Sequence, residues 1–313
     1  MKKALIVGIN NYPTTPLSGC INDAAALGSI IETHGDGSPN FAVRLETNVK
    51  SKSELKSAIV DLFDGAADTV LFYFSGHGFL NELGGFIVTP DYKKYDEGVS
   101  MDEILLLANN SKAKDKIIIL DCCHSGAFGS PKASGGATSQ INEGVVILTA
   151  SRDVESAIEV NGHGIFTNLL LDALQGGAAD LRGHMTPGSV YAYIDQALGP
   201  WDQRPVFKTN VTRFTSLRTI TPPVPLDVIR KITTYFPIPE HQFQLDPSFE
   251  DTNQGIADAT NVSIFKHLQK FQSVGLVVPV DEVFMYFAAQ NSKACRLTAL
   301  GYHYWRLVNE KRV

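Results

Sequence analysis

The sequence predicts an α/β fold in which a mostly parallel sheet carries helices on both faces, followed by a small C-terminal α+β domain. The first observation behind this prediction is a set of short, β-branched runs that are apolar on both faces, as buried parallel strands are. The expected strands are residues 4–9, 69–74, 116–120 and 145–149. The second observation is that helical patterns lie between and after these runs. The expected helices are residues 21–33, 52–63, 101–108, 166–174 and 188–198.

Length and composition are the third observation. The chain has 313 residues, of which 44% are hydrophobic and 19% are charged. This balance is typical of a soluble globular protein, and the length favours two domains. The Pro-rich segment 221–225 predicts a stiff linker, because proline fixes the backbone. We therefore expect one domain over residues 1–220 and a second over residues 226–313.

The second domain has a pattern of its own. Apolar residues recur at helical spacing over 226–236, and two short helical patterns follow at 256–260 and 262–274. Two runs, LVVPV at 276–280 and VFMYFAA at 283–289, are expected as strands, and a last helix is expected after Leu297 and Thr298. This order is similar to a winged helix, a module that contacts DNA or other proteins. We expect a regulatory domain that contacts an activating ligand or partner protein.

Charge argues against a nucleic-acid or membrane partner. The net charge is −6, and residues 221–313 carry nine basic and nine acidic side chains. Nucleic acids and anionic membranes attract basic surfaces, so neither is an expected partner. Lys266, His267 and Lys270 on one expected helix are a modest exception. No apolar run reaches the ~18 residues that a membrane-spanning helix needs.

The cysteines predict a cytoplasmic protein with free thiols. There are four, Cys20, Cys122, Cys123 and Cys295, in a long chain, whereas disulfide-stabilised proteins are usually small and cysteine-rich. The apolar stretch after the first two lysines is too short for a signal peptide and is expected as the first strand. The contiguous Cys122, Cys123 and His124 lack the spacing of a zinc site.

Polar residues follow two of the expected strands at the edge where such sheets carry their active sites. Ser75-Gly76-His77-Gly78 follows the strand at 69–74, and Asp121-Cys122-Cys123-His124 follows the strand at 116–120. A thiol is mostly protonated at neutral pH, so a neighbouring imidazole is what makes it a nucleophile. Backbone N–H groups of Gly78 and Cys123 are candidates for an oxyanion hole.

The motifs YFSGHG and LDCCHSG, which place His77 46 residues before Cys123, resemble those of caspase-type peptidases. Within that group the sequence is most similar to metacaspases and their bacterial relatives, the orthocaspases, whose nucleophile motif is Asp-x-Cys-His-Ser-Gly. Phe166-Thr167 and the segments 17–24 and 203–207 also resemble this family, so the similarity covers about residues 1–215. It implies that His77 is the general base and acid and that Cys123 is the nucleophile.

Cys122 is the competing nucleophile. Neighbouring residues in extended chain point to opposite faces, so only one of the two thiols can face His77. The family motif places the nucleophile directly before His-Ser-Gly, which selects Cys123 and leaves Cys122 as a buried structural thiol.

The resemblance also implies the substrate. In metacaspases the pocket for the residue before the cleaved bond is acidic, and its residues match Asp23 and Asp121, with Cys20 and Ser75 beside them. Two carboxylates attract a guanidinium or ammonium group and repel an acidic side chain. We therefore expect an endopeptidase that cleaves protein or peptide substrates after Arg, or Lys, and not after Asp.

Some metacaspases bind calcium, and their acidic cluster falls near Asp91, Asp102 and Glu103. The family has a further acid seven residues after the nucleophile, where this chain has Ser130. With one oxygen ligand fewer, we expect at most a weak calcium site and no required cofactor; solvated surface acids are the alternative.

The Gly/Ser-rich segment 129–144 is expected as a loop beside the nucleophile. Lys132 is its only basic residue, so it is the candidate site of self-cleavage.

The resemblance implies a regulated effector peptidase of a bacterial stress or defence pathway. The alternative is a catalytically silent scaffold that binds DNA or a protein partner through its C-terminal domain.

Overall fold

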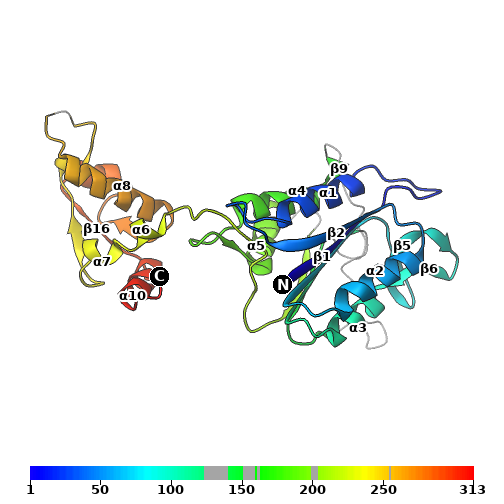
Figure 1. Ribbon diagram of the computed structural model, residues 1–313. Helices are drawn as coiled ribbons and strands as arrows, with labels where there is room; N and C mark the ends of the chain where they lie inside the picture. The colour runs from blue at the N-terminus through cyan, green and yellow to red at the C-terminus, as the bar shows by residue number, and fades with distance from the viewer. Residues whose placement is uncertain (123–139, 151–158, 161–162, 199–203, 254) are drawn as a thin grey trace. The chain divides into compact units, whose positions relative to one another are not determined.

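Figure 1 shows the computed structural model, which describes residues 1–122, 140–150, 159–160, 163–198, 204–253 and 255–313. The chain forms two compact units, one of Met1–Asp180 with His184–Ile220 and one of Leu181–Gly183 with Thr221–Val313. Among the residues just given, no helix is both long and apolar enough to cross a membrane.

The first unit is built on a six-stranded sheet with the strand order β12-β8-β7-β3-β1-β2. Its strands are β1 (Lys2–Gly8), β2 (Phe41–Thr47), β3 (Thr69–Ser75), β7 (Asp115–Asp121), β8 (Val145–Thr149) and β12 (Val206–Asn210). Neighbouring strands run parallel except for β12, which pairs antiparallel with β8 at one edge. The predicted mostly parallel sheet is therefore confirmed, and the four expected strands all belong to it.

Helices cover both faces of this sheet, as predicted. The helices are α1 (Cys20–Ile31), α2 (Lys52–Asp64), α3 (Met101–Asn110), α4 (Ile165–Asp172) and α5 (Pro187–Leu198). Figure 1 shows α2 and α3 on the opposite side of β1 from α1 and α4. Side chains of each strand alternate between the two cores, so that Phe72 enters the core on the α2–α3 face and Tyr73 enters the other. This double burial explains why the strands have no polar face.

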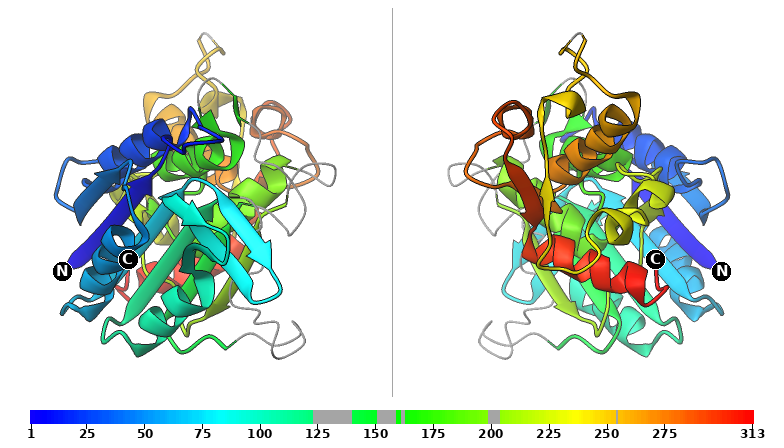
Figure 2. Two further views of the ribbon diagram at one scale, coloured as in Figure 1. Left: turned by 90° about the vertical axis from the view of Figure 1, so that its right-hand side faces the viewer. Right: turned by 90° about the vertical axis from the view of Figure 1, so that its left-hand side faces the viewer.

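Smaller elements complete the first unit. An antiparallel sheet is formed by β4 (Gly78–Asn81), β5 (Gly84–Lys93) and β6 (Asp96–Ser100), drawn in cyan in the left view of Figure 2. Two short pairs join β9 (Glu159–Val160) to β10 (His163–Gly164) and β11 (His184–Met185) to β13 (Arg218–Thr219), and a π-helical turn over Ala173–Gly177 follows α4.

Sequence analysis predicted neither these small elements nor β2 and β12. In β2 only Phe41 is buried, so this strand lacks the continuous apolar run by which the central strands were recognised. β12 also has an exposed end, at Thr209 and Asn210. Edge strands therefore differ in pattern from the central strands because only part of their surface is covered.

The second unit contains a three-stranded antiparallel sheet with the order β14-β16-β15, packed against helices. Its elements are α6 (Leu226–Ile229), α7 (Ile232–Tyr235), β14 (Gln242–Gln244), a 3-10 turn at Pro247–Phe249, α8 (Ala259–Ser273), β15 (Val277–Pro279), α9 (Met285–Gln290), β16 (Ala294–Leu297) and α10 (Ala299–Asn309). Val224 of the predicted linker is buried in the core of this unit. The winged-helix assignment stays a prediction.

Two expectations about this unit were wrong. No helix covers 256–258 of the first expected helix, and residues 259–260 join the second in one helix, α8. This helix begins where the Asp258 carboxylate accepts hydrogen bonds from the N–H groups of Thr260 and Asn261. The run at 283–289 is largely the helix α9 and contains no strand. Met285, Ala288 and Ala289 are buried at helical spacing while the intervening aromatic side chains are exposed, and this period is hidden in a run that is apolar throughout.

Burial on α3 gives a test of the packing on the α2–α3 face. Ile104 is 0% exposed whereas Leu106 on the same helix is 59% exposed. Ile104→Ala should lower the free energy of unfolding by about 2–5 kcal/mol, because it leaves a cavity in a packed core. Leu106→Ala should change it by less than about 0.5 kcal/mol. Chemical denaturation of both variants measures the difference, and equal losses would contradict the packing described.

Candidate active site

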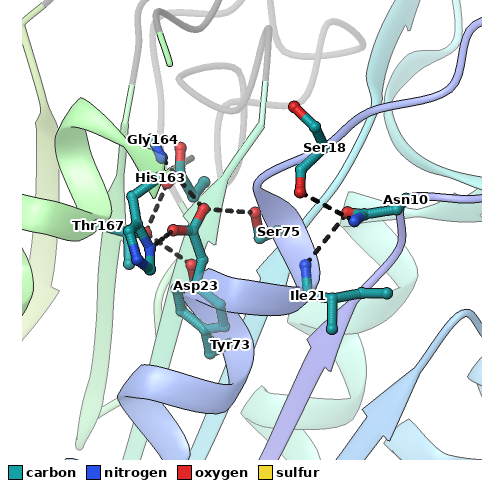
Figure 3. A network of polar contacts seen from close by, with 10 residues as sticks. Asn10, Ser18, Ile21, Asp23, Tyr73, Ser75, His163, Gly164 and Thr167 are labelled. Carbon is teal, nitrogen blue, oxygen red and sulfur yellow. Dashed lines mark hydrogen bonds and ion pairs between the residues drawn. The ribbon is translucent and has the colours of Figure 1, made fainter. Parts of the chain in front are cut away.

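The polar residues of the predicted site gather at the carboxyl ends of the parallel strands. Ser75 ends β3 and Asp121 ends β7, and the two are register partners in the sheet. α1 begins at Cys20, and its first turn places Asp23 at the same edge (Figure 3). The structure therefore brings together Asp23, Ser75 and Asp121, which sequence analysis had chosen from three separate segments.

Asp23 is a buried carboxylate with donors on both oxygens. Its side chain is 3% exposed, and its Oδ1 lies 2.7 Å from Nδ1 of His163. Its Oδ2 accepts hydrogen bonds from the Ser75 hydroxyl and the Gly164 N–H, each at 3.3 Å (Figure 3). Burial raises the pKa of Asp23, and the contacts with His163 and Gly164 oppose part of that rise.

Asp121 is buried beside a relay of hydroxyl groups. The Thr167 hydroxyl donates to Oδ2 of Asp121 at 2.6 Å, and the Tyr73 hydroxyl lies 2.6 Å from the same Thr167 oxygen. Because the single Thr167 proton goes to the carboxylate, Tyr73 is the donor to Thr167. Burial raises the pKa of Tyr73 well above its ordinary value, which keeps this phenol protonated for that role.

The two carboxylates converge on Gly164. A Cβ atom added to this glycine would lie 2.8 Å from Oδ2 of Asp121 and 3.5 Å from Oδ2 of Asp23. Both carboxylates therefore approach the Cα of Gly164 closely, and a side chain at this position would collide with Asp121. Two negative charges at one place repel each other and attract a cation.

His163 and Gly164 were missed by sequence analysis, and Thr167 was noted only as part of a matching segment. No local signal distinguishes His163-Gly164, because polar residues and glycine are common directly before a helix. Nothing in the sequence pairs them with Asp23, which lies 140 residues away from His163 in the chain.

His77 lies just beyond β3, and one nitrogen of its ring is hydrogen-bonded to the backbone. Its Nε2 is 2.7 Å from the backbone oxygen of Thr15. A carbonyl oxygen can only accept, so Nε2 carries the proton, and in the neutral ring Nδ1 is the basic nitrogen. An unprotonated Nδ1 can accept a proton, which is the capacity that a general base needs.

Tyr12 fixes the backbone of the histidine motif. Its hydroxyl accepts from the His77 N–H at 3.1 Å and donates to the Val88 oxygen at 3.2 Å, and its ring lies edge-on to the imidazole with centroids 4.5 Å apart. Burial raises the pKa of Tyr12, so it stays a donor. A Cβ on Gly76 would come within 2.5 Å of this hydroxyl, which explains the glycine before His77.

The other predicted residues of the active site are placed as follows. Gly78, a predicted oxyanion donor, begins β4 directly after His77. Cys20 is buried at the start of α1. Cys122 is 1% exposed in the core on the α2–α3 face, as expected of a structural thiol. Cys123, His124, Ser130 and Lys132 lie outside the described residues.

Two of the acids that match the calcium cluster of the family, Asp91 and Glu103, form hydrogen bonds or ion pairs with other residues. Asp91 accepts hydrogen bonds from the Lys52 N–H and the Thr89 hydroxyl, and Glu103 forms an ion pair with Lys56. Burial raises the pKa of Asp102. Within the part of the chain that the structure describes, no three His, Cys, Asp or Glu side chains are grouped to hold a metal ion, so Asp91, Asp102 and Glu103 do not form a ligand set.

The raised pKa of Asp23 has a consequence for stability. A carboxyl whose pKa is higher in the folded state than in the unfolded state stabilises the fold when protonated, and this stabilisation is lost as pH rises through the folded-state pKa. Asp23→Asn should therefore raise the melting temperature at pH 7, by about 2–4 °C for each 1 kcal/mol gained. The difference should shrink as pH falls toward the ordinary pKa of 3.8.

Thermal unfolding of the wild type and of Asp23→Asn between pH 4 and pH 7.5 measures this effect. Asp64→Asn, at the exposed end of α2, is the matched control and should leave the melting temperature unchanged. A less stable Asp23→Asn protein at pH 7 would show that the contacts of Asp23 outweigh the cost of its burial.

The chain is similar to a known protein family and to solved structures. Residues 1–214 match the family model described as Caspase domain. The crystal structure of protein GSU0716 from Geobacter sulfurreducens is similar with a TM-score of 0.53 and 17% identity, over 70% of this chain and 99% of that chain. Caspase-1 from Spodoptera frugiperda is similar with a TM-score of 0.51 and 15% identity, over 70% of this chain and 90% of that chain.

No curated protein sequence matches the chain. The two structures support the fold alone, because their identity to this chain is low, whereas the family model spans most of the sequence. The resemblance to caspase-type peptidases is thereby confirmed, and the narrower resemblance to metacaspases stays a prediction. The chain belongs to the caspase domain family, whose members are cysteine peptidases.

Proposed function

We propose that this protein is an endopeptidase that cleaves after Arg, or Lys, through a dyad of His77 and Cys123. The observation that carries the proposal is the pair of buried carboxylates, Asp23 and Asp121, that converge on Gly164 at the carboxyl edge of the sheet. The same strand edge leads into His77, so a binding site for a cation and a general base lie on neighbouring segments.

The charge of the pocket explains the choice of substrate. Each carboxylate is stabilised by hydroxyl or N–H donors, but none of these donors carries a permanent positive charge. A guanidinium or ammonium group entering the pocket would relieve the repulsion between the two acids and form charge-assisted hydrogen bonds. An aspartate side chain would add a third negative charge and would be rejected.

The chemistry assigned to His77 follows from its tautomer. With Nε2–H bound to the Thr15 oxygen, Nδ1 accepts the proton of the Cys123 thiol. The thiolate attacks the carbonyl carbon, and the C–N bond breaks as the imidazolium returns the proton to the leaving amine. Water then hydrolyses the thioester and regenerates the thiol. N–H groups of Gly78 and Cys123 are proposed to hold the oxyanion, with no metal required.

We also propose that the second unit regulates this activity by receiving a ligand or a partner protein, in a cytoplasmic stress or defence response. Its separate hydrophobic core supports a module distinct from the catalytic one. The neutral balance of its charged residues favours a protein partner over a nucleic acid.

Fluorogenic peptides ending in Arg, Lys or Asp test the substrate and the nucleophile together. The wild type should hydrolyse the Arg peptide best and leave the Asp peptide intact. Cys123→Ala should lower kcat to background, a loss of about 10⁴-fold or more, because the nucleophile is gone. Cys122→Ala is the matched control and should keep most of the activity.

Active-site titration with an Arg-directed covalent inhibitor, followed by peptide mapping, identifies the nucleophile directly. Label on Cys123 supports the dyad. Preferential hydrolysis of the Asp peptide would remove the pocket assignment. A wild type that neither hydrolyses peptides nor takes the label, with and without a cell extract as source of activator, would favour the silent scaffold.

Self-cleavage after Lys132 is a separate consequence of a basic specificity. Incubated wild-type protein should yield two fragments, one ending at Lys132 and the other beginning at the next residue. Intact-mass spectrometry would detect them. Lys132→Gln should abolish the cut without lowering stability, and Cys123→Ala should remain whole. Fragments in Cys123→Ala would indicate a contaminating protease.

A further inference from the structure

We propose that His163 is a positioning residue for the acidic pocket: its Nδ1–H holds the Asp23 carboxylate in the orientation and charge state that recognise a basic side chain. This inference rests on the function proposed above and names a residue that sequence analysis did not select. It concerns recognition of the substrate and assigns His163 no part in bond cleavage.

The contact itself is direct. Nδ1 of His163 lies 2.7 Å from Oδ1 of Asp23, and Figure 3 shows the imidazole turned toward this carboxylate. The His163 side chain is 28% exposed, whereas that of Asp23 is 3% exposed. A partly solvated ring thus supplies the donor to an acid that has almost no access to water.

The bonding of Asp23 shows what this donor supplies. Oδ2 already accepts from Ser75 and from the Gly164 N–H. Among the described residues, the donor that the structure gives to Oδ1 is His163. A buried carboxylate oxygen that loses its donor favours the protonated form, and a protonated Asp23 no longer attracts a guanidinium group.

One short segment organises both acids. His163 and Gly164 of β10 bind Asp23, and Thr167 in the first turn of α4 binds Asp121. The other titratable groups around Asp23 in the described structure are Asp121 on β7, Tyr73 on β3 and Cys20, one turn earlier on α1.

Two substitutions separate hydrogen bonding from mere packing. Asn has a donor near the place of Nδ1 and does not titrate, so His163→Asn should preserve the contact. His163→Ala removes it. With an Arg peptide at pH 7, His163→Ala should raise KM by about tenfold to a hundredfold, the range for a hydrogen bond to a charged group, while kcat changes by less than about threefold.

The pH profile is the second measurement. Removing the donor lets the pKa of Asp23 rise further, so the acid limb of kcat/KM for the Arg peptide should move to higher pH in His163→Ala and less in His163→Asn. His34→Asn is the matched control. His34 follows the far end of α1, away from Asp23, and its Nδ1 is also hydrogen-bonded, in this case to Thr219. It should leave KM and the pH profile unchanged.

Binding of agmatine, which carries a guanidinium group, tests His163 without any cleavage. Calorimetry should show weaker binding to His163→Ala than to wild type and near-normal binding to His163→Asn. If the wild type cleaves no Arg or Lys peptide but agmatine binding still depends on His163, the positioning role stands and the proposed proteolysis falls.

Other outcomes overturn the positioning role while leaving the proposed function intact. An unchanged KM and pH profile in His163→Ala would make the contact incidental. A lower KM and tighter agmatine binding in His163→Ala would mean that His163 occupies the pocket and competes with the substrate. Equal damage in His163→Asn and His163→Ala would show that a donor at Nδ1 is not what Asp23 needs.

Discussion

Burial of two carboxylates at one sheet edge is the constraint on which the rest of the site depends. Asp23 and Asp121 are 2% and 6% exposed, and a buried charge is costly unless donors surround it. The donors come from β3, β10 and α4, so several elements must meet within hydrogen-bond distance of both acids. The architecture of the first unit is therefore what brings the two buried acids and their donors together.

The parallel sheet makes this meeting possible. Because β1, β3 and β7 run in the same direction, their carboxyl ends share an edge, and the register places Ser75 beside Asp121 without any loop adjustment. Cores on both faces hold these strands rigidly, since every central residue packs on one side or the other. The polar groups at the strand ends then have fixed positions, which the proposed recognition of a planar guanidinium group would require.

Stability and the proposed recognition of a cation oppose each other at Asp23. Desolvation raises the pKa of Asp23, so burial disfavours the ionised carboxylate. Only the ionised carboxylate attracts a cation. Hydrogen bonds from Ser75, His163 and Gly164 reduce the conflict without cancelling the charge. Sites that hold charge in this way commonly sacrifice some stability for function.

The sequence by itself determined the central strands and the helices on both faces, because continuous apolar runs are local patterns. It also placed Ser75, His77 and Asp121 at the ends of strands, whereas Asp23 was matched only through the resemblance to metacaspases. It did not determine β2 and β12, whose partial exposure breaks that pattern, nor α9, whose helical period is hidden in an apolar run. Only the tertiary structure decided that His163 binds Asp23 and that the Thr15 oxygen sets the tautomer of His77. These contacts join residues distant in the chain, and no local pattern encodes which distant partner a donor will meet.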